Sequence, residues 1–125
     1  MTQALIVCFG ACLGALLRWQ LGLMWNNAIE LPLGTLAVNW IGGYLIGIFI
    51  GVAQIVPNLD PMWRLLLVTG FLGTLTTFSS FSAEMVGFII NERYITALGG
   101  IALHLLGSLA LTALGIKTIQ FFFTS

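Results

Sequence analysis

Charged residues are scarce in this 125-residue chain. It has four Lys or Arg and four Asp or Glu residues, so only 6% of the chain is charged and the formal net charge is zero. Soluble domains carry about 25% charged residues, so this chain has too few for a surface in water. No basic run is present, which argues against a nucleic-acid partner. The 59% hydrophobic content and the mean hydropathy of +1.08 indicate an integral membrane protein.

Histidine and cysteine are also scarce, which limits the chemistry of the chain. It has one His and two Cys, and Cys8 and Cys12 lie one helical turn apart with no further metal ligands nearby. We interpret the two cysteines as small apolar residues on one helix face. With no Cys–His pair and no phosphate-binding loop, we do not expect an enzyme. The first residues lack a basic leader and a cleavage site, so we expect no removable signal peptide.

The hydrophobic residues gather in four segments. Each is long enough to cross a bilayer as a helix, which takes about 20 residues. The segments are Thr2–Met24, Leu33–Val56, Met62–Ile90 and Ile95–Phe121. Asp60 followed by Pro61 is typical of a helix N-cap and first turn, so we expect the third helix to begin there. The pattern predicts an all-α integral membrane protein, with residues 1–125 as a single four-helix transmembrane domain.

The third segment contains an unusual cluster of hydroxyl side chains. Six fall within nine residues: Thr74, Thr76, Thr77, Ser79, Ser80 and Ser82. Lipid cannot satisfy so many donors and acceptors, and two preceding glycines with β-branched threonines disfavour a continuous helix. Irregular or polar structure at membrane depth is stable only where protein buries it or where it lines a wet cavity. The cluster therefore predicts a broken third helix beside a permeation path or an ion site.

The cations are divided evenly between the two sides of the membrane. With four spans, Arg64 and Lys117 fall on one side, and Arg18 and Arg93 fall on the other. Neither side has an excess of positive charge, so the positive-inside rule favours no orientation of the chain. We therefore expect dual topology, in which the chain inserts both ways and forms an antiparallel homodimer of inverted subunits. The alternative is that a single cation dominates and fixes one orientation.

Polar residues within the spans are candidate functional residues. Asn39 lies one turn into the second span and offers two amide donors, and its alternative role is to hold helices together. Glu84 follows the hydroxyl cluster and could cap a helix, form a pair or carry protons. Arg18 lies toward the end of the first span, where a side chain that reaches the interface is the ordinary explanation.

The fourth span carries a polar stripe. His104, Ser108 and Thr112 recur every four residues and therefore share one helix face. A single histidine is often a packing residue, but three polar residues in one stripe favour a functional face. The unperturbed pKa of histidine is about 6.5, so we hypothesise that His104 near a pore would make transport sensitive to pH.

Two phenylalanines lie among the hydroxyls. Phe78 and Phe81 are three residues apart, a spacing that is usually core packing, but a phenyl ring also has a positive edge that can contact a small anion. Moving a bare anion into a low dielectric costs on the order of tens of kcal/mol, so donors must replace its water. Many weak neutral donors allow both binding and release, whereas a fixed cation could trap the ion. The candidate donors are the ring edges, the hydroxyls and the amide of Asn39.

Three motifs together resemble the Fluc (CrcB) fluoride channel family over nearly the whole chain. Gly14-Ala-Leu-Leu-Arg-Trp19 resembles the first-helix motif of the family, and Gly34-Thr-Leu-Ala-Val-Asn-Trp-Ile-Gly42 resembles the second. The segment from Gly70 to Glu84 resembles the third motif and is the most specific.

The resemblance implies a fluoride-selective ion channel that exports fluoride passively from the cytoplasm and relieves fluoride toxicity. It implies a dual-topology antiparallel homodimer, multi-pass in the cell inner membrane, with two pores that are each built from both subunits. It also implies a structural Na⁺ at the dimer axis. The expected partners are therefore fluoride, sodium, a second copy of the chain and the lipid bilayer.

The resemblance also implies roles for individual residues. The ring edges of Phe78 and Phe81 would contact fluoride, Asn39 would be the pore asparagine, and the backbone carbonyls of Gly73 and Thr76 would hold Na⁺. The further pore residues would be Thr77, Ser80, Ser108 and Thr112. Arg18 would serve near the pore entrance or in anchoring, while Glu84 and His104 have no assigned role.

The alternative from a different class is a small dual-topology, proton-coupled multidrug transporter, which is also short and four-spanning. Such transporters resemble one another in a membrane-embedded acid on the first helix, and Thr2–Met24 contains no Asp or Glu. A non-conducting assembly subunit is a third possibility, but it leaves the hydroxyl cluster and the paired phenylalanines without a purpose.

Overall fold

The computed structural model describes residues 1–124, and every regular element within that range is a helix. The elements are α1 (Thr2–Trp25), α2 (Leu33–Ile55), α3 (Pro61–Trp63), η1 (Arg64–Leu72), α4 (Gly73–Leu75), α5 (Phe78–Ile90) and α6 (Tyr94–Phe123). Together they form four stretches that are long and apolar enough to cross a membrane, with α3, η1, α4 and α5 forming the third. The prediction of an all-α chain with four membrane-spanning segments is confirmed.

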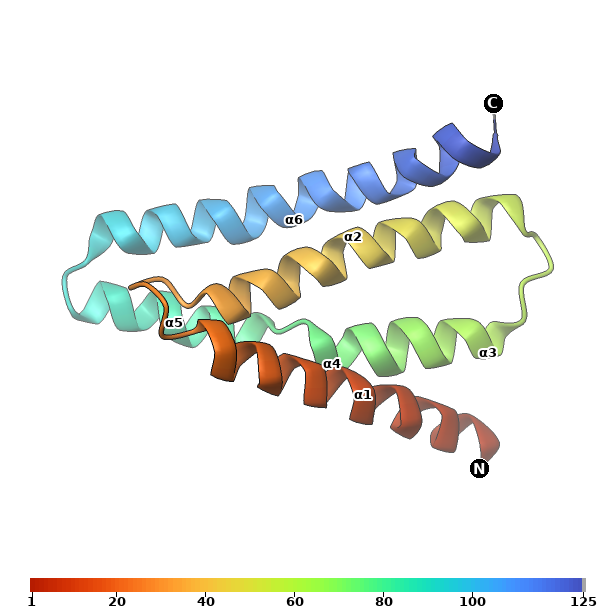
Figure 1. Ribbon diagram of the computed structural model, residues 1–125, viewed down its shortest axis with the longest axis horizontal. Helices are drawn as coiled ribbons and strands as arrows, with labels where there is room; N and C mark the ends of the chain where they lie inside the picture. The colour runs from red at the N-terminus through yellow and green to blue at the C-terminus, as the bar shows by residue number, and fades with distance from the viewer. Residues whose placement is uncertain (125) are drawn as a thin grey trace.

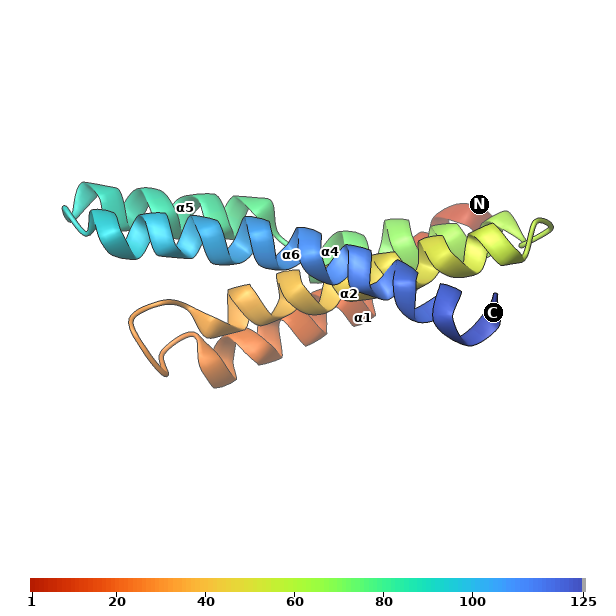
Figure 2. The ribbon, with the colours of Figure 1, turned by 90° about the horizontal axis from the view of Figure 1, so that it is seen from above.

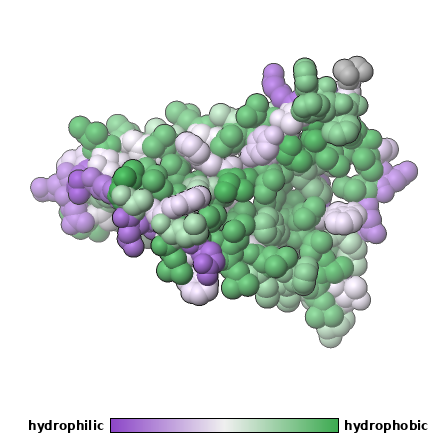
Figure 3. Space-filling model, in the orientation of Figure 1, coloured by the Kyte–Doolittle hydropathy of each residue, from purple (hydrophilic) through white to green (hydrophobic). Residues whose placement is uncertain are grey.

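The four stretches run up and down, so both chain ends lie at one end of the molecule (Figure 1). The α1–α2 and α5–α6 loops lie at the opposite end, where an exposed ion pair between Glu30 and Arg93 joins them. α2 packs along α6, and α1 packs along η1. At the loop end, α1 and α2 diverge from α5 and α6 (Figure 2). Hydrophobic residues cover the middle of the face in Figure 3, and most hydrophilic residues lie toward its two ends.

Glycines allow the helices to approach closely, as small residues commonly do in membrane bundles. A Cβ atom on Gly70 of η1 would lie 2.7 Å from the Val7 carbonyl oxygen and 3.2 Å from the Cα atom of Gly10 in α1. A Cβ atom on Gly47 of α2 would lie 3.0 Å from the Cα atom of Gly115 in α6. Both helix pairs therefore pack backbone against backbone, which fixes the spacing between α1 and η1 and between α2 and α6.

The third span is irregular. It begins as predicted at Asp60, whose carboxylate accepts the backbone N–H of Met62 at 3.0 Å, with Pro61 in the first turn. η1 then follows as nine residues of π-helix, a rare form that is frequent at functional sites. α4 ends at Leu75, and Thr76 (φ −81°, ψ 155°) and Thr77 (φ −149°, ψ 115°) have extended backbone before α5 begins. These two threonines lie at the middle of a 30-residue span.

Candidate functional site

The extended segment between α4 and α5 is held by the side chain of Asn39 in α2. The Asn39 Oδ1 atom accepts the backbone N–H of Thr77 at 2.8 Å, and its Nδ2 atom donates to the carbonyl oxygen of Thr77 at 3.1 Å. The Thr77 Oγ1 atom in turn accepts the N–H of Ser80 at 3.1 Å and caps α5. Asn39 therefore satisfies backbone groups that an unbroken helix would have paired internally.

These bonds release two backbone carbonyls. In a continuous α-helix, the N–H of Thr77 would donate to the Gly73 oxygen and the N–H of Ser80 to the Thr76 oxygen. Here the first donates to Asn39 and the second to the Thr77 hydroxyl. Gly73 and Thr76 thus present the carbonyl oxygens that the helix break frees, and such oxygens suit a hard cation.

Three polar groups in and just before this segment, the Thr74 carbonyl and the hydroxyls of Thr74 and Thr76, already have hydrogen-bond partners within the chain. Arg18 donates from Nε to the Thr74 carbonyl oxygen at 2.9 Å, and the Thr74 hydroxyl donates to the Ala11 carbonyl at 2.9 Å. The Thr76 hydroxyl donates back to the Leu72 carbonyl at 2.8 Å. Arg18 therefore anchors the end of α4 to α1, and the Thr74 and Thr76 hydroxyls stabilise backbone.

A groove of about 680 Å³ lies between α2, the middle of the third span and α6. Eight of the twelve predicted site residues line it: Asn39, Gly73, Thr76, Thr77, Phe78, Phe81, His104 and Ser108. No charged side chain among the described residues lines this groove. The fold therefore gathers most of the residues that the sequence singled out, from three separate spans, around one neutral space.

The aromatic residues form a short stack within this groove. The rings of Phe78 and Phe81 meet edge to face with centroids 5.5 Å apart. Phe81 also lies against the imidazole of His104, with ring centroids 4.5 Å apart. Phe78 is 79% exposed although it lies near the middle of a span. The Phe78 ring is consequently available to a ligand or to another protein surface.

A second, polar cavity of about 520 Å³ lies toward the loop end between α1, α2 and α5. Three predicted residues, Arg18, Ser80 and Glu84, line this cavity, and Thr77 borders both cavities. The Glu84 Oε2 atom accepts the Thr35 hydroxyl at 2.6 Å, whereas Oε1 is buried and has no partner within residues 1–124. Arg18 and Glu84 therefore lie beside the same polar cavity.

Sequence reasoning missed Thr35 and Asn26. The Asn26 Oδ1 atom accepts the Thr35 backbone N–H at 2.9 Å, which fixes the start of α2 beside Glu84. Thr35 belongs to the motif Gly34–Gly42, but nothing in the sequence indicates that its hydroxyl contacts Glu84, 49 residues away.

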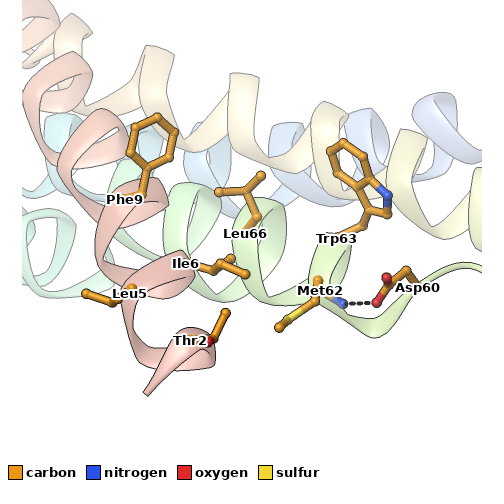
Figure 4. Close-up of a pocket in the computed structure, with 8 residues that line it drawn as sticks. All are labelled: Thr2, Leu5, Ile6, Phe9, Asp60, Met62, Trp63 and Leu66. Carbon is orange, nitrogen blue, oxygen red and sulfur yellow. Dashed lines mark hydrogen bonds between the residues drawn. The ribbon is translucent and has the colours of Figure 1, made fainter.

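Thr112 is the one predicted residue that lines neither cavity. Its hydroxyl donates to the carbonyl oxygens of Gly43 and Ser108, each at 2.9 Å, at the contact between α2 and α6. A further pocket of about 470 Å³ lies between the start of α1 and α3 (Figure 4). It contains none of the predicted site residues and is mostly apolar.

Comparison with known proteins decides the family. Residues 5–116 match the family described as CrcB-like protein, Camphor Resistance (CrcB). The chain belongs to the CrcB family. A relative from Albidiferax ferrireducens, named Fluoride-specific ion channel FluC, is 62% identical over 121 residues, which cover 97% of this chain and 93% of that protein.

Two further CrcB-family relatives carry the same name. The protein from Paracidovorax citrulli is 56% identical over 90% of each chain. The protein from Chromohalobacter salexigens is 61% identical over 87% of this chain and 83% of its own length. These relatives are ion channels by name, which confirms the prediction that this CrcB-family chain is not an enzyme. Together with the four spans, they identify a multi-pass membrane protein.

Proposed function

We propose that this protein is a fluoride-specific ion channel that lets fluoride leave the cytoplasm passively and so relieves its toxicity. The observation that carries the proposal is the neutral groove in which Phe78 and Phe81 lie beside the Asn39–Thr77 contact. The names of the CrcB-family relatives support the choice of ion.

The chemistry of the groove suits an anion that has to leave again. An anion that sheds water needs other donors, because burying it bare costs on the order of tens of kcal/mol. The ring edges of Phe78 and Phe81 carry partial positive charge, and Ser108 adds a hydroxyl. None of these groups has a full charge, so the ion is held weakly enough to move on. Thr77 lines both the groove and the polar cavity, and Ser80 adds a hydroxyl on the side of the polar cavity.

The open groove supports an antiparallel homodimer. Phe78 is 79% exposed near the middle of its span, and a second inverted copy would cover it. A two-fold axis in the membrane plane brings a residue next to its own copy only near mid-membrane, and the interruption at Thr76 and Thr77 lies at the middle of its span. Each copy brings its own groove, which gives two pores per dimer. Such a dimer requires insertion in both orientations, in a multi-pass arrangement in the cell inner membrane.

The same axis offers a site for a structural Na⁺. Gly73 and Thr76 line the groove, and their carbonyl oxygens lack the hydrogen bonds that a continuous helix would give them. Two copies would supply four such oxygens around the axis, which is the donor chemistry that a hard cation prefers. Exchange of Na⁺ for a bulky organic cation throughout purification is then expected to reduce fluoride flux without unfolding the chain.

Anion efflux from liposomes tests the main proposal. Purified protein is reconstituted, and fluoride and chloride electrodes record release in parallel, with protein-free liposomes as the control. We expect rapid fluoride release without chloride release. If a correctly folded preparation releases no fluoride, the channel proposal is wrong, and a proton-coupled multidrug transport assay becomes the next test.

A further inference from the structure

His104 has one ring nitrogen with a partner and one without. Its side chain is buried, with only 4% of the residue exposed, and it lines the groove beside Phe81. The Nδ1 atom lies 3.0 Å from the Nδ2 atom of Asn39. The Nε2 atom is buried and has no hydrogen-bond partner within residues 1–124. A buried polar atom without a partner is rare in folded proteins and calls for an explanation.

The contacts of Asn39 determine which nitrogen carries the proton. The backbone N–H of Thr77 can only donate, so the Asn39 atom 2.8 Å away is the amide oxygen. The Thr77 carbonyl can only accept, so the atom 3.1 Å away is the amide nitrogen. An amide NH₂ group donates and cannot accept. The Nδ1 atom of His104 must therefore accept from Asn39, and the proton of the neutral ring is on Nε2.

The residue that carries this donor lines a groove suited to a small anion. The imidazole ring contacts Phe81 with centroids 4.5 Å apart, and Phe81 meets Phe78 edge to face. No charged side chain from the described part of the chain lines the groove. An N–H group on a neutral ring gives an anion a hydrogen bond without a fixed charge that would hold it in place.

We infer that His104 is an anion-binding residue, held by Asn39 as the neutral Nε2–H form, and that this N–H donates to fluoride passing the two phenylalanines. The inference rests on the proposed function and gives His104 a role that the family resemblance left open. Because Nε2 is covered in the structure, the inference requires that fluoride displace neighbouring side chains to reach it.

Nitrogen NMR tests this inference directly, because His104 is the only histidine in the chain. Protein carrying ¹⁵N-histidine and no histidine tag is reconstituted in bilayers near neutral pH, and fluoride efflux is measured on the same preparation. We expect one protonated nitrogen, Nε2, and one unprotonated nitrogen, Nδ1. Sodium fluoride should shift the Nε2–H resonance, whereas sodium gluconate at equal concentration should leave it unchanged. A proton on Nδ1, or an Nε2–H resonance that does not shift when sodium fluoride is added, would overturn the inference.

Two substitutions separate the donor from the volume of the side chain. His104→Gln keeps an acceptor for Asn39 and an N–H donor, and we expect fluoride flux within a few-fold of the wild type. His104→Met is similar in size but has no donor, and we expect flux to fall roughly ten- to a hundred-fold, as for loss of a hydrogen bond to an ion. Equal flux in both variants would contradict the inference. Absence of fluoride flux in the wild type would instead refute the proposed function.

Discussion

Asn39→Asp is the sharpest test of how the interruption in the third span is held. The substitution keeps the side-chain shape and replaces only Nδ2 by oxygen. The acceptor for the Thr77 N–H, now at 2.8 Å, remains. The donors to the Thr77 carbonyl at 3.1 Å and to His104 Nδ1 at 3.0 Å are both lost and replaced by an acceptor.

The expected cost follows from these contacts. Each lost hydrogen bond removes about 1 kcal/mol, and an acceptor facing another acceptor leaves buried groups unsatisfied. Even a neutral acid recovers only one of the two donors, and an ionised one would face the Thr77 carbonyl oxygen and the unprotonated His104 nitrogen with no donor for either. We expect the free energy of unfolding in detergent to fall by about 2–3 kcal/mol. The same substitution leaves Thr77 and His104 without their donor beside the groove, so we expect fluoride flux to fall roughly tenfold or more, which corresponds to a permeation barrier about 1.4 kcal/mol higher.

Asn58→Asp is the matched control for this experiment. Asn58 is exposed in the α2–α3 loop, and its side chain makes no hydrogen bond with residues 1–124. The same chemical change there should alter neither stability nor flux. Liposome efflux and chemical unfolding are measured for both variants after size-exclusion chromatography. If Asn39→Asp behaves like Asn58→Asp in both assays, Asn39 does not hold the interruption and has no part in the pore.

Phe81→Ile keeps the bulk of the side chain but removes the ring edge, so fluoride efflux should collapse while the elution volume in size-exclusion chromatography stays that of the wild type. Phe9→Ile, on the exposed side of α1, is the control. Equal efflux in the two variants would refute the ring-edge argument. Gly70→Ala should cost about 1–3 kcal/mol of stability in a denaturant titration, because its Cβ atom would lie 2.7 Å from a backbone oxygen. Gly87→Ala, with nothing within 4 Å, should be neutral or stabilising, and equal losses would contradict the close packing. Glu30→Gln removes the exposed ion pair with Arg93 and should change the free energy of unfolding by less than about 1 kcal/mol. A larger loss in the same denaturant titration would show that this pair holds the α1–α2 and α5–α6 loops together.

The amino-acid sequence by itself determined the elements that depend on local composition. Hydrophobic run length fixed the four spans, because a bilayer requires about 20 apolar residues per helix. Asp60 and Pro61 marked the start of the third helix, since an N-cap and its first turn are neighbours in the chain. The hydroxyl cluster and the phenylalanines marked the candidate site, because such residues are out of place in lipid.

Only the tertiary structure decided what each polar group contacts. Asn39 pairs with the backbone of Thr77, 38 residues away, and that contact diverts the hydrogen bond that would have covered the Gly73 carbonyl. Thr112 shares a helix face with Ser108, yet its hydroxyl donates to the Gly43 carbonyl oxygen. The π-helix also had no signature in the sequence. Helix periodicity states which residues share a face, but hydrogen-bond partners depend on how distant helices are packed and rotated against one another.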